Sequence, residues 1–232
     1  MAWALKTTTS AFLYGGSSSS AQNHAAGSLI IVLMSGTASR TVTAIANTAG
    51  DTYTQCSGVR RVDYGAWVDI WYTANSAGNA SNVITPTMSN TDSQGSLIVV
   101  SFTGHTTTSP FEAAANGNDV YDDNVVTTGS FSPAAAGNLN IAIAASFSQD
   151  GGWTAGGSYT LGTEESTTHG IAMRLEGAAS GSQTASITHS AAGIMNMGLA
   201  SFKPAAGASF VPYPLSSRGA RGGLLVPSGG LQ

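Results

Sequence analysis

Charged residues are scarce in this sequence. Only 9% of its 232 residues are Asp, Glu, Lys or Arg, whereas a soluble domain usually has about a quarter. The formal net charge is -4, which excludes a basic surface of the kind that holds nucleic acid or an anionic membrane. Ser, Thr, Asn, Gly and Ala must therefore form most of the surface. Such a surface costs little to desolvate and suits contact with other protein copies or with carbohydrate.

Cysteine and long apolar segments are also scarce. Cys56 is the only cysteine, which excludes a disulfide or a multi-cysteine metal site within one chain and predicts a small buried side chain. No stretch reaches the length of a membrane span. The first residues, "MAWALKTTTSAFLYGG", lack a secretory signal pattern because Lys6 interrupts the apolar run. We therefore expect synthesis in the cytosol and no membrane span.

Strand patterns, by contrast, are plentiful. Gly, Ser, Thr and Asn interrupt every run before a helical period develops, while short apolar or alternating runs recur between turn residues. This pattern predicts an all-β fold, an antiparallel β-sandwich of jelly-roll type. The predicted strands cover residues 28–34, 40–47, 52–56, 66–73, 82–88, 96–103, 138–147, 169–176, 183–190 and 194–203.

Four of these runs resemble one another. "GSLIIVLMSG" (27–36) nearly repeats as "GSLIVVSFTG" (95–104), and "GNLNIAIAASF" (137–147) has the shape of "GIMNMGLASF" (193–202). The intervals are unequal, which excludes a solenoid. We expect four central strands, each entered through a glycine turn and buried on both faces.

The two ends differ from the middle in composition. Residues 1–26 contain the linker-like run "GGSSSSAQNH", and residues 204–232 are rich in Gly and Pro. We therefore expect an N-terminal arm over 1–26, a sandwich domain over 27–203 and a C-terminal arm over 204–232. The C-terminal arm is predicted to contact neighbouring subunits through Pro212, Pro214, Arg218, Arg221, Leu224 and Leu225.

No catalytic motif is recognisable. The histidines lack metal-binding spacing, no G-x-S-x-G elbow occurs, and the carboxylates Glu164, Glu165 and Glu176 lack the E-x-D-x-E pattern of sandwich glucanases. We predict a non-enzymatic protein without a cofactor. Calcium is the one candidate metal ion, since the loop "NGNDVYDDN" offers hard oxygen atoms; a solvated loop is the alternative. The candidate ligands are Asp119, Asp122, Asp123 and Asn124.

Two aromatic clusters are candidates for binding sugar. Trp153, on a glycine-rich loop with Asp150 and Tyr159 nearby, is the better candidate for an exposed glycan site; the alternative is a tryptophan that closes one end of the sandwich. In "AWVDIWY" (66–72), Trp67, Asp69 and Trp71 share one face of a strand. We expect that face to lie against its own chain or another subunit, with Asp69 bonded to Arg60, Arg61 or a backbone donor.

A resemblance extends over about residues 27–203. The segments "AGDTYTQ", "VDIWYTANSAGNASNVIT" and "GSLIVVSFTG", followed by "SPFE", resemble a jelly-roll or concanavalin-like domain of tailed-phage virion proteins and uncharacterised bacterial proteins. The resemblance implies structural roles for its matching residues and no catalytic set. The matching residues are Gly50, Asp51, Tyr53, Ile70, Trp71, Tyr72 and Gly104.

This resemblance implies a structural protein of a bacteriophage particle. A capsid decoration or cement protein, or a tail-associated protein, would be made in the host cytoplasm and reside in the virion. Its partners would be other copies of itself, in a homo-oligomer, and other virion proteins such as the major capsid protein. The alternative is a carbohydrate-binding module or adhesin, extracellular or at a cell surface, used for host attachment to a glycan.

Overall fold

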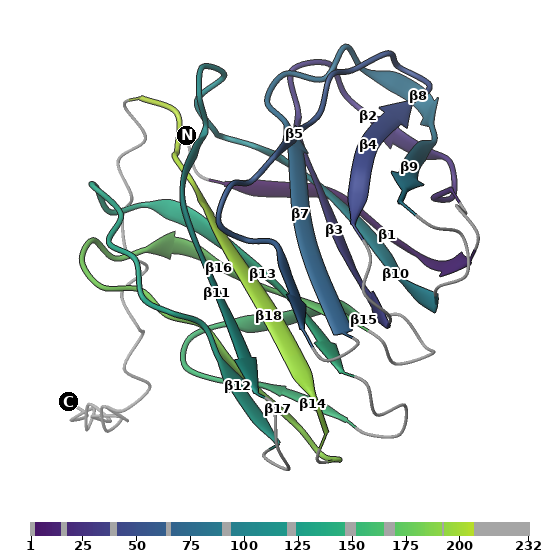
Figure 1. Ribbon diagram of the computed structural model, residues 1–232. Coiled ribbons are helices and arrows are strands. Elements are labelled where there is room, and N and C mark those ends of the chain that lie inside the picture. Colours follow the sequence, from purple (N-terminus) through teal and green to yellow (C-terminus); the bar gives the residue numbers. More distant parts are fainter. Residues whose placement is uncertain are drawn as a thin grey trace, which may run out of the picture.

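The computed structural model describes residues 3–14, 18–37, 41–63, 66–89, 94–119, 124–146, 152–164, 170–191 and 193–206. These residues form eighteen strands and no helix, and the strand pairs are antiparallel. The predicted all-β antiparallel sandwich is therefore confirmed (Figure 1). The predicted C-terminal arm, beyond residue 206, lies outside the described residues.

Two inner sheets face each other, and each is built by one half of the chain. The first has the order β1 (Ala4–Tyr14), β10 (Gln94–Thr103), β3 (Leu29–Thr37), β7 (Ala66–Thr73) and β5 (Thr54–Gln55), with β6 (Arg61–Asp63) also paired to β7. The second has the order β11 (Phe111–Asp119), β18 (Met195–Phe202), β13 (Asn138–Ser146), β16 (Ile171–Ala178) and β15 (Thr160–Glu164). In Figure 1 the first half runs from purple through blue to teal, and the second from teal through green to yellow.

Shorter strands cover the outer face of each inner sheet. In the first half these are the pair β4 (Val42–Asn47) and β9 (Ile84–Met88), beside the pair β2 (Gln22–His24) and β8 (Asn79–Asn82). In the second half they are β12 (Val125–Thr127), β17 (Ser186–His189) and β14 (Trp153–Ala155). Three apolar cores result, one between the inner sheets and one beneath each outer layer. This double cover explains why β3, β10, β13 and β18 are buried on both faces, as their apolar runs predicted.

The two halves have the same architecture. The orders β1-β10-β3-β7-β5 and β11-β18-β13-β16-β15 are equivalent position by position. Phe102 pairs with Leu29 in one sheet, and Phe202 pairs with Leu139 in the other. Both edge strands also shift register at the same place, at Lys6 in β1 and at Glu112 in β11. The similar runs at 27–36 and 95–104 thus form the neighbouring strands β3 and β10 of the first sheet, and those at 137–147 and 193–202 form β13 and β18 at the equivalent places in the second.

The prediction of an N-terminal arm over 1–26 is wrong for the described residues. Trp3 is buried in the central core, its ring meets that of Phe102 edge to face at 6.2 Å, and its Nε1 donates a hydrogen bond to the Gly137 carbonyl at 2.7 Å. Residues 4–14 form strand β1, which pairs with β10 along its length, and residues 22–24 form β2. The sandwich therefore begins before residue 27, because the polar Thr- and Ser-rich segment is an edge strand and not a linker.

Candidate functional site

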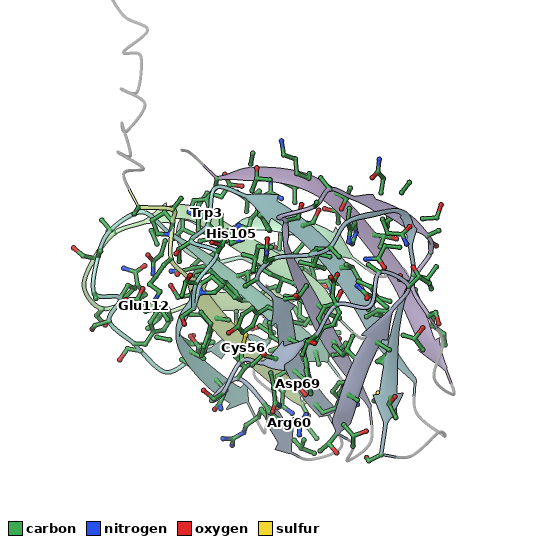
Figure 2. All side chains as sticks on the ribbon, turned by 90° about the horizontal axis from the view of Figure 1, so that it is seen from above. Trp3, Cys56, Arg60, Asp69, His105 and Glu112 are labelled. Carbon is green, nitrogen blue, oxygen red and sulfur yellow. The ribbon has the colours of Figure 1, made fainter. Side chains whose placement is uncertain are left out.

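Asp69, in the middle of β7, accepts more hydrogen bonds than any other carboxylate among the described residues. Its side chain is 1% exposed, and Oδ2 accepts hydrogen bonds from Arg60 Nε at 2.9 Å and from Trp71 Nε1 at 3.1 Å. Gln55 Nε2 donates to Oδ1 at 2.8 Å, and Arg60 Nη2 reaches both Oδ2 and the Val42 carbonyl. Figure 2 shows Arg60 beside Asp69.

These contacts confirm that the Asp69 face lies against its own chain and that Arg60 is its partner. Burial raises the pKa of Asp69, and the hydrogen bonds from Gln55, Arg60 and Trp71 partly oppose that rise. Trp67 lies in the apolar core beneath the outer strands, with Trp71 packed against that core. The cluster ties β7 to β4, with Trp67 fully buried and Trp71 partly buried.

The other carboxylates with described side chains are also engaged in structure. Asp51 accepts from Asn47 Nδ2 and Ser76 Oγ, both at 2.8 Å, and from the Ala77 amide at 2.7 Å. Glu112 accepts from the Ala134 amide at 2.8 Å and from the Asn138 side chain.

Glu176, one of the three carboxylates considered for catalysis, pairs with Arg174 at 3.2 Å. Glu165 and the side chain of Glu164 lie outside the described part of the chain. Among the described residues, no carboxylate is therefore left free as an acid or base facing a second one.

The described histidines are buried and held by structural contacts. His24 lies 3.4 Å from the Asn82 amide through Nδ1, His105 Nε2 donates to the Ala74 carbonyl at 2.6 Å, and His189 Nδ1 donates to the Ala191 carbonyl at 2.8 Å. Burial lowers the pKa of His24 and of His105. Within the described residues, no three His, Cys, Asp or Glu side chains gather as a metal site. Cys56 is buried and free, as predicted, and burial raises the pKa of its thiol.

The predicted glycan site does not hold at its central residue. Trp153 is only 7% exposed, and its ring lies 4.4 Å from that of His189 in the core beneath the second outer layer. The prediction of an exposed indole is wrong, because Trp153 belongs to the short strand β14, whose inward face covers the second inner sheet. Tyr159 is half-buried against the same core, and burial raises its pKa to about 12. Asp150 lies outside the described residues.

The predicted calcium ligands are only partly described. Asn124 is exposed, and its backbone carbonyl accepts a hydrogen bond from the His189 amide at 2.7 Å. Asp119 ends strand β11, opposite Met195, with its side chain outside the description. Asp122 and Asp123 lie outside the described residues, so the calcium site stays a prediction. The predicted contact residues of the C-terminal arm also lie outside the described residues; they are Pro212, Pro214, Arg218, Arg221, Leu224 and Leu225.

A polar groove of about 430 Å³ lies where the first half meets the segment that joins the halves. Tyr72 forms part of its wall, and its ring packs against Phe111 at 6.0 Å and Phe202 at 5.5 Å. Ser109 opposite has a φ of 47°, a left-handed conformation that non-glycine residues seldom adopt. The groove is lined by Asp51, Thr52, Thr54, Tyr72, Thr73, Ala74, Asn75, Ser109 and Pro110.

This groove was not evident from the sequence. Asp51 and Tyr72 stood out as structural residues of the resemblance, and Ser109 gave no signal. Only the fold brings the turn at 51–54, the end of β7 and residues 109–110 together. Hydroxyl and carboxylate groups beside an aromatic ring are the chemistry that binds sugars.

No family model, no curated protein and no solved structure matches this chain. The resemblance to phage virion domains therefore stays a prediction, and the groove and the buried clusters must be interpreted from their own chemistry. No helix in the described ranges is long and apolar enough to cross a membrane.

Proposed function

We propose that this protein is a non-enzymatic structural protein that assembles with copies of itself and with other proteins, and that the assembly is a phage particle. The observation that carries the proposal is the open edge of β1. This eleven-residue strand pairs with β10 on one side, and no described strand pairs with its other side. An open edge of this length presents a row of backbone donors and acceptors to a partner strand.

The sequence of β1 leaves that edge unprotected. Its only charged residue is Lys6, which lies at the register shift near one end. The equivalent edge in the second half is partly closed: the Asn116 carbonyl accepts a hydrogen bond from the Gly129 amide, and Asn116 Nδ2 donates to the Gly58 carbonyl, both at 2.9 Å. A protein that avoids assembly would protect both edges by such means.

The occupant that we propose for the β1 edge is the C-terminal segment of a neighbouring copy. Residues 224–226, Leu-Leu-Val, give that segment a short apolar run between glycines and Pro227. Strand addition would hold the contact through main-chain hydrogen bonds, and stability would then depend on assembly by mass action. The engagement of Asp51, Asp69, Glu112 and Glu176 in structural contacts supports the non-enzymatic part of the proposal.

Two variants test the assembly. Deletion of residues 207–232 is expected to abolish self-association in sedimentation velocity while the sandwich keeps its circular dichroism spectrum. Thr9→Lys, in the middle of β1, is expected to weaken association in the full chain by placing a charge at the edge. Thr154→Lys, on the exposed face of β14, is the matched control and should associate normally. Association unchanged in both test variants would contradict strand addition.

The virion assignment has its own test. Neighbouring genes are expected to encode a major capsid or tail protein, and purified particles should contain this chain by mass spectrometry. Neighbours that form a metabolic operon would contradict it.

Carbohydrate binding is a second candidate, favoured by the polar groove beside Tyr72. The intact protein is expected to bind defined glycans on an array, and Asn75→Ala, at the groove rim, should weaken binding at least tenfold. Asn79→Ala, outside the groove lining, is the control. Failure of the intact protein to bind any glycan would contradict this candidate.

A further inference from the structure

A second cavity, of about 240 Å³, lies between the two inner sheets. Strands β1 and β10 form one wall, and β13, β15 and β16 form the other. Its lining residues are apolar except for Thr8 and Arg174. The cavity is lined by Leu5, Thr8, Val100, Phe102, Ile141, Gly162, Ala172 and Arg174.

Arg174 also borders a polar depression outside this cavity. That depression measures about 310 Å³ and is lined by Ser158, Thr160, Arg174, Leu175 and Glu176. The Arg174 side chain is 31% exposed. Arg174 thus lies between a mostly apolar cavity and a hydroxyl-lined depression, an arrangement that suits an amphiphilic molecule.

Because the two halves have the same strand order, the residues of this cavity can be compared with those at equivalent positions in the first half. Tyr72 pairs with Ile31 in the first sheet, and Arg174 pairs with Ile141 in the second, so Tyr72 and Arg174 occupy equivalent positions. In the same registers Ile70 corresponds to Ala172.

The neighbouring strands extend the correspondence. Phe111 corresponds to Leu5, since both precede the shared register shift. Cys56, whose amide donates to the Ile70 carbonyl, corresponds to Gly162, which lies against the Ala172 carbonyl. The cavity and the region around Tyr72 therefore occupy equivalent places in the two halves. We call the Tyr72 region the first seam and the cavity region the second seam.

Large side chains fill the first seam. The Tyr72, Phe111 and Phe202 rings pack with centroids 5.5 to 6.1 Å apart. Cys56 and Ile70 are fully buried beside them. In the second seam each of the four equivalent positions carries a smaller or a non-aromatic side chain. The replacements are Leu for Phe, Gly for Cys, Ala for Ile and Arg for Tyr.

Protein interiors seldom leave a space of this size unfilled. An apolar cavity of about 150 Å³ is large enough for benzene, so this cavity has room for about six to ten carbon atoms. We propose that it is a binding site for a small carboxylic acid with an apolar chain or ring. The apolar part would lie between Phe102, Ile141 and Ala172, and the carboxylate would bind Arg174.

Arg174 is suited to that carboxylate. A guanidinium binds a carboxylate through two parallel hydrogen bonds, which an ammonium group cannot reproduce. Its Nε pairs with Glu176 Oε1 at 3.2 Å. The ligand would then be bound through the terminal nitrogen atoms, with the Ser158 and Thr160 hydroxyls beside its head group.

The test uses octanoate, 1-octanol and acetate as probes of the full-length protein by calorimetry. Octanoate is expected to bind with a Kd below about 1 mM, octanol more weakly, and acetate not measurably. Ala172→Ile, which restores the residue of the filled seam, should weaken octanoate binding at least tenfold. Ala172→Val is the substitute if the isoleucine variant does not fold.

The Arg174→Gln variant tests the contribution of the ligand's carboxylate separately from that of its alkyl chain. It should weaken octanoate binding about tenfold and leave octanol binding unchanged, whereas Lys203→Gln, the charge-matched control away from the lining, should change neither. Absence of saturable binding by the unmodified protein, or full binding by Ala172→Ile, would overturn the site. Equal loss of both probes in Arg174→Gln would overturn the carboxylate as the ligand class.

Discussion

The two halves of the molecule repeat the same strand order with different side chains at matching places. Where β7 carries Asp69, bonded to Arg60, Gln55 and Trp71, the equivalent position on β16 is Ile171, which is 2% exposed in an apolar core. By register, Asp69 faces Met34 and Ile171 faces Ala144. The same backbone position thus accepts either a bonded carboxylate or an aliphatic side chain, provided that the outer layer supplies what each requires.

The halves differ again at the seams and at the sheet edges. One seam is filled by aromatic rings and the other holds a cavity. One edge is partly closed by Asn116, whereas the outer side of β1 pairs with no strand among the described residues. Neither difference alters the strand pairing. In a repeated fold, one half can therefore keep the side chains that stabilise it while the other half carries different ones. Each of these differences marks a place where binding is possible.

The largest expected effect comes from removing the bonded carboxylate. Asp69→Ala leaves the Arg60 guanidinium and the Gln55 amide without their acceptor, so the free energy of unfolding should fall by about 3–5 kcal/mol. Denaturant unfolding measures the loss. Asp69→Asn keeps the side-chain volume and one acceptor and should lose less. A loss below about 1 kcal/mol for Asp69→Ala would show that the cluster is not a main link between β7 and the outer layer.

Exchanging side chains between the seams tests the equivalence directly. Ile70→Ala opens the filled seam and should cost about 2–5 kcal/mol of unfolding free energy. Ala172→Ile fills the cavity and should stabilise the ligand-free protein by about 0.5–2 kcal/mol. Thermal and denaturant unfolding of both variants give the comparison. Destabilisation by both would mean that the second seam is already packed to its limit.

A smaller change tests the contact between the two halves. Trp3→Phe keeps an aromatic ring against Phe102 and removes the hydrogen bond to the Gly137 carbonyl. The expected cost is about 0.5–1.5 kcal/mol for that bond, with a further loss if the smaller ring leaves space. Stability equal to that of the unmodified protein would mean that water replaces the indole donor.

The smallest expected effect is on pH dependence. Burial lowers the pKa of His24 and of His105 below the value of 6.5 expected in the unfolded chain. The unfolded state then binds more protons, so stability is complete above pH 6.5 and declines as the pH falls below it. A His24→Asn, His105→Gln variant should show a shallower decline between pH 7 and 5 in thermal unfolding. An unchanged slope would assign the decline to other groups.

Much of the fold follows from local sequence. The apolar runs at 28–34 and 138–147 predicted strands buried on both faces, because only double cover allows such runs in a soluble sheet. The partner of Asp69 was also predictable, since a carboxylate between two indoles requires donors and Arg60 lies close along the chain.

The errors have a physical origin too. The centre of strand β1 is the uninterrupted polar run at residues 7–10, and the serine run that follows the strand suggested a linker. Trp153 lies among glycines, and local composition does not reveal which core a three-residue strand covers. The groove and the cavity are each lined by residues from distant segments, so no local sequence pattern predicts either one.

The segment at 104–110, which joins the two halves, lies alongside the end of β18. The Ala205 amide donates to the Gly104 carbonyl at 2.7 Å, and the Lys203 amide donates to the Pro110 carbonyl at 2.8 Å. Trp3 Nε1 donates a hydrogen bond to the Gly137 carbonyl, and the Pro204 ring lies beside Gly137. The order of the halves along the chain is therefore interchangeable: a circular permutant that starts at Pro110 and joins Ala206 to Trp3 through a short linker would preserve every strand pair.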